Sequence, residues 1–77
     1  MDYEATVRKA LARVAPDANV ETLDPDAELQ EELGLDSMDF ITFLGELFRL
    51  SGISVTEADY PQVRTMSKCV AYLRAHA

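Results

Sequence analysis

The chain has few of the residues that build covalent, metal-bound or membrane-spanning structures. Its 77 residues include one cysteine, Cys69, and one histidine, His76. A single cysteine cannot form an internal disulfide, and one cysteine with one histidine is too few for a zinc site, which needs about four ligands. No signal peptide is visible, and no apolar run is long enough to span a membrane. These absences predict a protein without a membrane span, in the cytoplasm or another reducing compartment.

Basic residues are scarce and unevenly placed. Seven Lys and Arg stand against fourteen Asp and Glu, which gives a formal net charge of −7. Between Val14 and Phe48 there are ten acidic residues and no Lys or Arg. Nucleic-acid binding requires clustered basic side chains, so nucleic acid is excluded as a partner. An acidic surface of this kind favours basic protein surfaces instead.

Catalytic and metal-binding groups are also missing. A serine nucleophile needs a nearby base, but the only histidine is near the end of the chain and no lysine lies between Lys9 and Lys68. The sequence contains no glycine-rich loop of the kind that binds phosphate groups. The alternating acids near residues 24–28 do not make an EF-hand, because Leu29 stands where the loop requires Gly and Leu35 where it requires Glu. We therefore expect no catalytic residue, no metal site and no enzyme activity.

The apolar residues that are present recur at helical spacing and predict an all-α fold. Helices are expected at residues 3–14, 37–50 and 66–75, with a one-turn helix at 56–60 that Thr56 caps and Pro61 closes. We predict one domain, residues 1–77, folded as a small four-helix bundle with three main helices and a short third one. The long connection at 15–36 must be pinned to the core by its apolar residues and contain a short helical turn at 28–32. The candidate anchors are Val20, Leu23, Leu29, Leu33 and Leu35.

The predicted helix at 37–50 has a wider apolar arc than one core contact needs. Phe40, Phe43 and Leu47 are expected in the core, with Leu44 at their edge. The remaining apolar residues are predicted to form a partner-facing edge: Met38, Ile41 and Phe48. Gly45, inside the helix, predicts close packing or a bulky partner.

In the last predicted helix, the inner stripe contains Met66, Cys69, Val70 and Leu73, with Tyr72 at its edge. Cys69 is read as a small core residue and His76 as a solvent-exposed tail residue.

The stretch from Leu33 to Phe40 joins the acidic connection to this helix. Gly34 permits a tight turn, and Asp36 or Ser37 can cap the helix through a side-chain oxygen. Asp39 adds a second carboxylate in the first turn, in the arrangement of a capping box. Ser37 is therefore predicted to lie exposed at the positive end of a helix dipole, where an attached phosphate is favoured.

The sequence Gly34-Leu35-Asp36-Ser37-Met38 resembles the phosphopantetheine attachment site of acyl carrier proteins, with Met in place of the usual Leu. The resemblance covers nearly the whole chain in length, helix order and acidity. It implies that Ser37, preceded by Asp36, carries 4′-phosphopantetheine, added by a phosphopantetheinyl transferase. It further implies a monomer that holds acyl groups as thioesters for acyl-transferring or acyl-activating enzymes. The residues expected to bind these partners are Met38, Asp39, Ile41 and Phe48.

The sequence departs from the fatty-acid carriers at Glu46-Leu47-Phe48-Arg49, where those proteins continue with a run of Glu residues. The partner surface is thus more apolar and less acidic, which favours a dedicated carrier with few partners. Two alternatives remain open. One is an aminoacyl or peptidyl carrier of similar fold, and the other is a helical adaptor that keeps the fold but is never modified.

Overall fold

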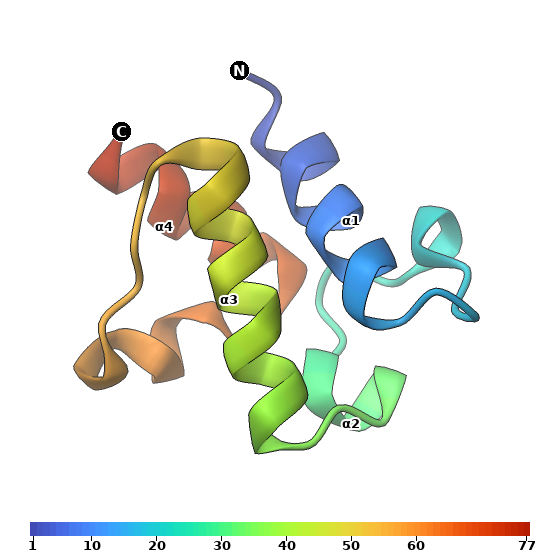
Figure 1. Cartoon of the computed structure of the whole chain (residues 1–77). Coiled ribbons are helices and arrows are strands. Elements are labelled where there is room, and N and C mark those ends of the chain that lie inside the picture. The colour runs from blue at the N-terminus through green and yellow to red at the C-terminus, as the bar shows by residue number, and fades with distance from the viewer.

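Helical segments without strands make up the computed structural model, which describes residues 1–77 (Figure 1). The α-helices are α1 (Tyr3–Val14), α2 (Leu29–Leu33), α3 (Ser37–Ser51) and α4 (Met66–His76), and two 3-10 helices are η1 (Val20–Thr22) and η2 (Glu57–Val63). α1 packs against both α3 and α4, and η2 packs against α4. The predicted all-α bundle, with three main helices and a shorter third one, is confirmed.

Capping residues in the sequence fix the ends of the first and last helices. Asp2 accepts the Ala5 N–H at 3.1 Å at the start of α1, and the Thr65 hydroxyl accepts the Lys68 N–H at 3.1 Å at the start of α4. α1 ends just before Ala15 and Pro16, because proline cannot continue the hydrogen-bond ladder. The predicted bounds of both helices hold to within one residue.

Apolar side chains hold the long connection at 15–36 against the bundle, as its sequence predicts. Four of them are buried: Val20, Leu23, Leu29 and Leu35. Leu33 is half-buried against the same core. The short helical turn predicted at 28–32 is α2, whereas η1 is a further turn that the sequence did not predict. Asn19 caps η1 by accepting the Glu21 N–H at 3.2 Å.

The predicted one-turn helix at 56–60 is longer than expected. Pro61 lies inside η2, which continues to Val63, so the prediction that Pro61 closes this helix is wrong. Proline removes one N–H donor only, and its fixed φ near −65° suits a 3-10 turn. Thr56 precedes the helix as predicted, but its side chain makes no capping bond. Its carbonyl instead accepts the Asp59 N–H at 2.9 Å.

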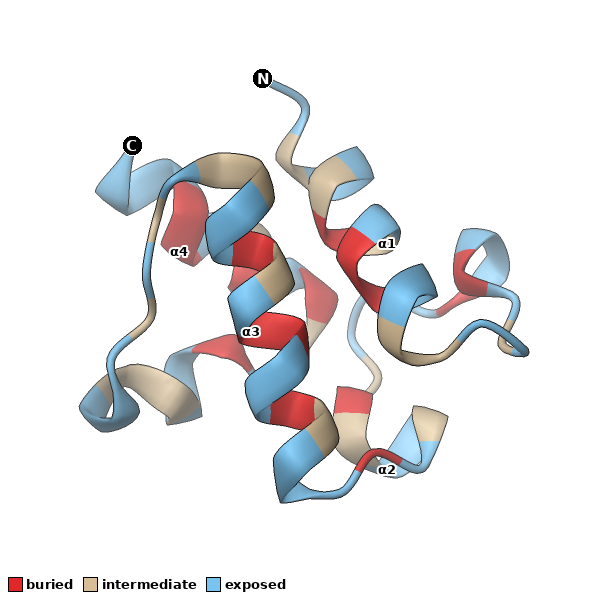
Figure 2. Ribbon diagram, viewed as in Figure 1, coloured by how far each residue is buried: buried red, intermediate tan, exposed pale blue.

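α3 has one buried face and one exposed face. Its buried residues are Phe40, Phe43, Leu44 and Leu47, which join the main hydrophobic core. Figure 2 shows buried and exposed residues alternating along this helix. The alternation follows from 3.6 residues per turn, which brings residues three or four apart onto the same side. The predicted core face of this helix is therefore confirmed.

α4 contributes buried side chains to the same core and also anchors η2. Cys69 is fully buried, as predicted, whereas Val70 is only half-buried. Tyr72, predicted at the edge, is buried with 5% of its surface exposed. Its hydroxyl donates a 2.7 Å hydrogen bond to the Asp59 carboxylate, which ties η2 to α4. This bond and burial raise the pKa of Tyr72 above its ordinary value.

Candidate functional site

Ser37 is the first residue of α3 and is exposed to solvent. Gly34, at φ 65°, ends α2 in the left-handed conformation that glycine favours and turns the chain toward α3. Asp36 is the N-cap: it accepts the Asp39 N–H at 2.8 Å, while the Asp39 carboxylate accepts the Asp36 N–H at 3.4 Å. The predicted capping box is present, and Asp36 rather than Ser37 provides the cap. The Ser37 hydroxyl makes no hydrogen bond within the protein and is free to react.

The backbone at the start of α3 keeps unused hydrogen-bond donors. The Asp39 N–H bonds to Asp36, but the N–H groups of Ser37 and Met38 have no acceptor within the protein. Free N–H groups and the helix dipole together favour negative charge at this point. A phosphate on the Ser37 oxygen would therefore lie in a favourable electrostatic environment, although the carboxylates of Asp36 and Asp39 oppose it.

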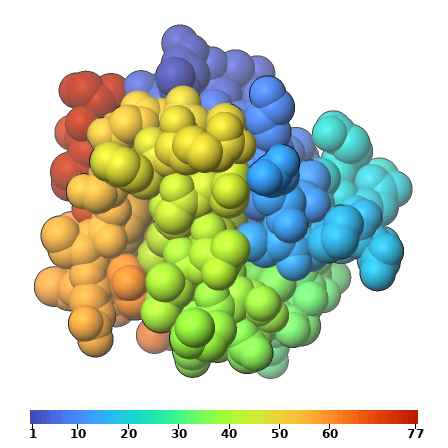
Figure 3. Space-filling view, in the orientation of Figure 1, coloured from blue at the N-terminus to red at the C-terminus, as the bar shows by residue number.

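A groove of about 330 Å³ opens beside Ser37, between α3 and η2. Its apolar wall includes Phe40, whose ring meets the ring of Tyr60 edge-on at 5.8 Å. Figure 3 shows the exposed surface of α3, in green and yellow, running down the middle of this face with the orange η2 segment beside it. The residues that line the groove are Gln30, Ser37, Phe40, Ile41, Glu57, Tyr60, Pro61 and Arg64.

The sequence predicts Ser37 and Ile41 at a functional surface but does not connect Gln30, η2 or Arg64 with them. No motif joins these segments, because they meet only through folding. The one available signal is charge: Arg64 is the only basic residue in a groove next to a stretch without Lys or Arg.

The solvent face of α3 continues away from this groove as an apolar stripe. Met38, Ile41 and Phe48 are 71%, 50% and 54% exposed, as the wide apolar arc predicted. Gly45 lies on the same stripe, and a Cβ atom added there would meet no other atom within 4 Å. Close packing within the chain is therefore not the reason for this glycine, which corrects one of the two explanations offered from the sequence.

The far end of α3 carries a compensated charge. The Glu46 carboxylate forms an ion pair with the Arg49 guanidinium, three residues further on, at 2.8 Å. The same carboxylate lies 3.9 Å from the guanidinium of Arg13 on α1. The hydrogen bond from Arg49 lowers the pKa of the Glu46 carboxyl below its ordinary value, and the charge of Arg13 acts in the same direction. The exposed surface is thus acidic around Asp39 and close to neutral around Phe48.

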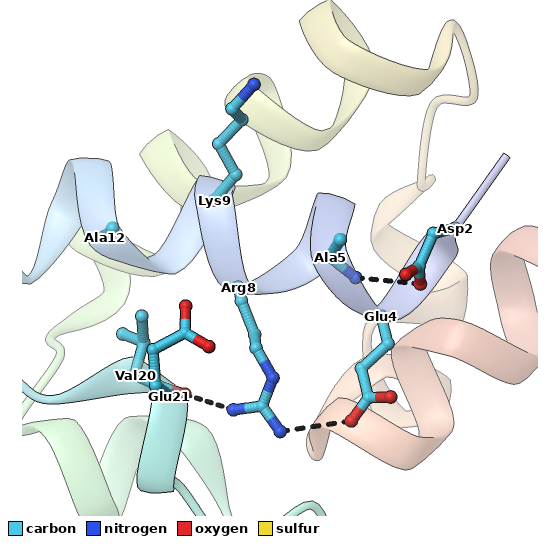
Figure 4. A pocket seen from close by; sticks show the side chains of 8 residues that line it. All are labelled: Asp2, Glu4, Ala5, Arg8, Lys9, Ala12, Val20 and Glu21. Carbon is cyan, nitrogen blue, oxygen red and sulfur yellow. Dashed lines mark hydrogen bonds and ion pairs between the residues drawn. The ribbon is translucent and has the colours of Figure 1, made fainter.

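A second hollow, between α1 and η1, is a structural feature of the connection (Figure 4). Its central side chain, Arg8, donates one hydrogen bond to the Val20 carbonyl and pairs with Glu4 at 3.0 Å. Lys9 points away from these partners in the same view. Arg8 is already occupied in holding η1 against α1, and the walls are largely charged, so this hollow offers little to an apolar group.

Neither Cys69 nor His76 makes a hydrogen bond to Ser37. Burial raises the pKa of the Cys69 thiol to about 12, which keeps it protonated, and the thiol contacts the Val63 carbonyl at 3.3 Å. His76, exposed as predicted, stacks on Tyr72 with ring centres 3.9 Å apart. No group of three or more His, Cys, Asp or Glu side chains is arranged to hold a metal ion. No helix combines the length and apolar content needed to cross a lipid bilayer.

Comparison with known proteins shows similarity over nearly the full length of the chain. A family model described as "Phosphopantetheine attachment site" matches residues 5–73. The acyl carrier protein of Desulforapulum autotrophicum is 26% identical over 74 residues, which are 96% of this chain and 96% of that protein. No solved structure gives a significant match.

The family match extends from α1 to α4 and includes the capped start of α3 with its free serine. Proteins of this family bear a 4′-phosphopantetheine group and act as carriers, while catalysis resides in the enzymes that they serve. The chain belongs to the phosphopantetheine attachment-site family of carrier proteins.

Proposed function

We propose that the chain carries acyl groups as thioesters on a 4′-phosphopantetheine arm attached to the Ser37 hydroxyl. The observation that carries this proposal is the free, exposed Ser37 hydroxyl at the start of α3, within the family match. When attached, the arm supplies a terminal thiol on a flexible tether. The protein supplies the attachment point, the groove beside it and a surface that partner enzymes recognise.

The residues at the start of α3 fit an attached phosphodiester. The free N–H groups of Ser37 and Met38 and the helix dipole stabilise its negative charge. Asp36 fixes the first turn through its bond to the Asp39 N–H, so that the Ser37 oxygen stays outside the helix. The base that takes the serine proton must come from the phosphopantetheinyl transferase, since the only histidine lies in the last turn of α4.

The partner surface in this proposal is the exposed stripe of α3 with Asp39 beside it. Asp39 and the acidic connection attract basic enzymes, and Met38, Ile41 and Phe48 supply apolar contacts. The enzymes expected there are acyl-transferring or acyl-activating ones, in addition to the transferase that adds the arm. Because Arg49 and Arg13 offset Glu46 next to the exposed Phe48, we infer a dedicated carrier in specialised acyl biosynthesis. Service to a general fatty-acid synthase is the broader alternative.

The proposed carrier works as a monomer in the cytoplasm or another reducing compartment. Its single thiol, Cys69, is buried and free, so the fold depends on no disulfide. Light scattering on the purified protein tests the monomer, with a mass of 8.6 kDa for one chain.

Intact-mass measurement after co-expression with a broad-specificity phosphopantetheinyl transferase tests the attachment. The wild-type chain should gain one phosphopantetheine, and Ser37→Ala should gain none while its circular dichroism stays unchanged. Ser54→Ala, at another exposed serine, is the matched control and should be modified fully. Modification of Ser37→Ala would refute the site, and loss of helix in that variant would mean that Ser37 is mainly structural.

The same intact-mass experiment, followed by loading of the arm, distinguishes two other functions. An aminoacyl or peptidyl carrier would also gain the arm, but its thiol would be loaded by amino-acid-activating enzymes and not by acyl-activating ones. An unmodified helical adaptor would keep its unmodified mass with every transferase tested.

A further inference from the structure

Arg64 stands out in the groove beside Ser37 because its charge is not used by the fold. The three ion pairs of the structure engage Arg8, Arg13 and Arg49, and no hydrogen bond involves the Arg64 side chain. The residue is exposed, and it is the only Lys or Arg that lines this groove. The Arg64 guanidinium thus has no ion pair or hydrogen bond within the protein and lines the same groove as Ser37.

The backbone of Arg64 is nevertheless firmly held, so the side chain starts from a fixed place. Its carbonyl accepts the Leu29 N–H at 2.9 Å, and the adjacent Thr65 forms an isolated antiparallel bridge with Glu28. Thr65 also caps α4. These bonds join the start of α2 to the start of α4 and hold Arg64 at the edge of the groove that Ser37 lines.

The phosphodiester of an attached arm would add negative charge to an edge of the groove that is already acidic. It carries one negative charge at neutral pH, and the carboxylates of Asp36 and Asp39 lie in the same turn of α3. No other Lys or Arg is available from the neighbouring sequence, since none occurs between Val14 and Phe48. A guanidinium matches a phosphate better than an ammonium does, because its planar fork can donate two parallel hydrogen bonds.

We propose that Arg64 is a positioning residue that pairs with the phosphodiester linking the arm to Ser37, and that this pair directs the arm into the groove along η2. The proposal rests on the proposed function. The amide of Gln30 provides a second polar partner at the same groove, and Ile41, Tyr60 and Pro61 form the apolar surface along which the pantetheine chain lies. Glu57, which lines the groove without pairing to Arg64, limits the strength of the pair through its opposite charge.

Because the pair is exposed, it is weak and sensitive to salt, which suits an arm that must leave the groove to reach enzymes. An exposed ion pair supports roughly a two- to five-fold change in the ratio of docked to free arm. Added salt screens such a pair, so high ionic strength should release the arm in the same way as removal of the guanidinium.

The test uses the arm-bearing protein, with the loading of every variant first measured by intact mass. The phosphorus NMR signal reports the environment of the phosphodiester, and through-space contacts between the methyl groups of the arm and the Tyr60 ring report docking. Arg64→Gln should lower the docked-to-free ratio about two- to five-fold, and Arg64→Lys should restore it in part. Arg74→Gln removes an exposed charge from α4 outside this groove and should match the wild type.

Melting temperatures of Arg64→Gln and Arg74→Gln should equal that of the wild type, because neither side chain makes an ion pair in the fold. In the wild type, about 1 M salt should reproduce the Arg64→Gln spectrum. Unchanged phosphorus signals and arm contacts in fully loaded Arg64→Gln would overturn the role of Arg64 and leave the proposed function intact. Failure of the wild type to gain the arm would overturn both.

Discussion

The two faces of α3 are built from the same kinds of residue and differ in what covers them. Phe43 and Leu47 are fully buried in the core, where α1 packs against α3, whereas Ile41 and Phe48 remain about half exposed. Hydrophobicity therefore does not decide which residues of this helix are buried. Their angular position does, because a small bundle can cover only one side of its central helix.

The buried face of α3 contributes to the stability of the fold, and its exposed face is the proposed recognition surface. A helix that needed only to fold would carry polar residues on its solvent face, as most surface helices do. α3 instead keeps a stripe of exposed apolar side chains that begins next to Ser37. Substitutions on the buried face should then change the free energy of unfolding, and those on the exposed face should change reactions with partner enzymes.

The largest expected effect is on the buried face. Leu47→Ala removes a fully buried side chain and should lower the free energy of unfolding by about 2–5 kcal/mol, through lost burial and the cavity left behind. Ile41→Ala is the matched control on the exposed face and should change it by less than about 0.5 kcal/mol. Urea unfolding followed by circular dichroism measures both. Equal destabilisation by the two variants would remove the distinction between the faces.

A charge at Phe48 tests the exposed face directly. Phe48→Glu removes an apolar contact and introduces the acidity typical of fatty-acid carriers. It should therefore weaken binding to the native partner enzyme roughly tenfold, or by about 1.4 kcal/mol. The same change should improve acceptance by an acyltransferase of a general fatty-acid synthase. Steady-state rates of wild type, Phe48→Glu and Phe48→Ala with both enzymes measure this. If all rates were the same, Phe48 would not determine specificity.

The acidic end of α3 should act mainly on the rate of encounter. Asp39→Lys reverses a charge in the first turn and should slow association with the phosphopantetheinyl transferase several-fold at low salt. Glu21→Lys makes the same charge change in η1 and is the control for net charge. In stopped-flow measurements, the association rates of Asp39→Lys and wild type with the transferase should converge as the salt concentration rises. A difference that persists at high salt would point to a direct contact or to damage to the helix cap.

The smallest effect concerns the gap in the exposed stripe. Gly45→Ala adds a methyl group that meets no other atom, so it should stabilise the protein by about 0.5–1 kcal/mol through helix propensity. If a partner side chain enters the gap between Ile41 and Phe48, the same variant should react more slowly with that partner. In that case, thermal unfolding would show a more stable protein, while the partner assay would show a slower reaction. If the variant were destabilised, glycine at position 45 would be required by the fold itself.

Much of the fold follows from short-range pattern. The bounds of α1 and α4, the capping box of Asp36 and Asp39, and the exposure of Met38 and Phe48 were all predictable, because caps and helical periodicity are local properties. The prediction failed at η2, where Pro61 does not end the helix. Proline lacks the N–H donor that either kind of helix uses at that position, but its fixed φ fits a 3-10 turn, so the sequence alone did not show that this helix continues past Pro61.

The sequence by itself determined the proposed attachment motif at Ser37, the acidic stretch around it and the apolar excess of α3. Only the tertiary structure decided what lies beside the serine. Ser37 on α3 and Gln30 on α2 line one groove with Tyr60 on η2 and Arg64 before α4, although the two pairs come from distant stretches of the chain. Their meeting depends on the packing of η2 against α4 and on the bond between Leu29 and Arg64. Such long-range contacts arise from the simultaneous burial of several helices, which no local spacing records.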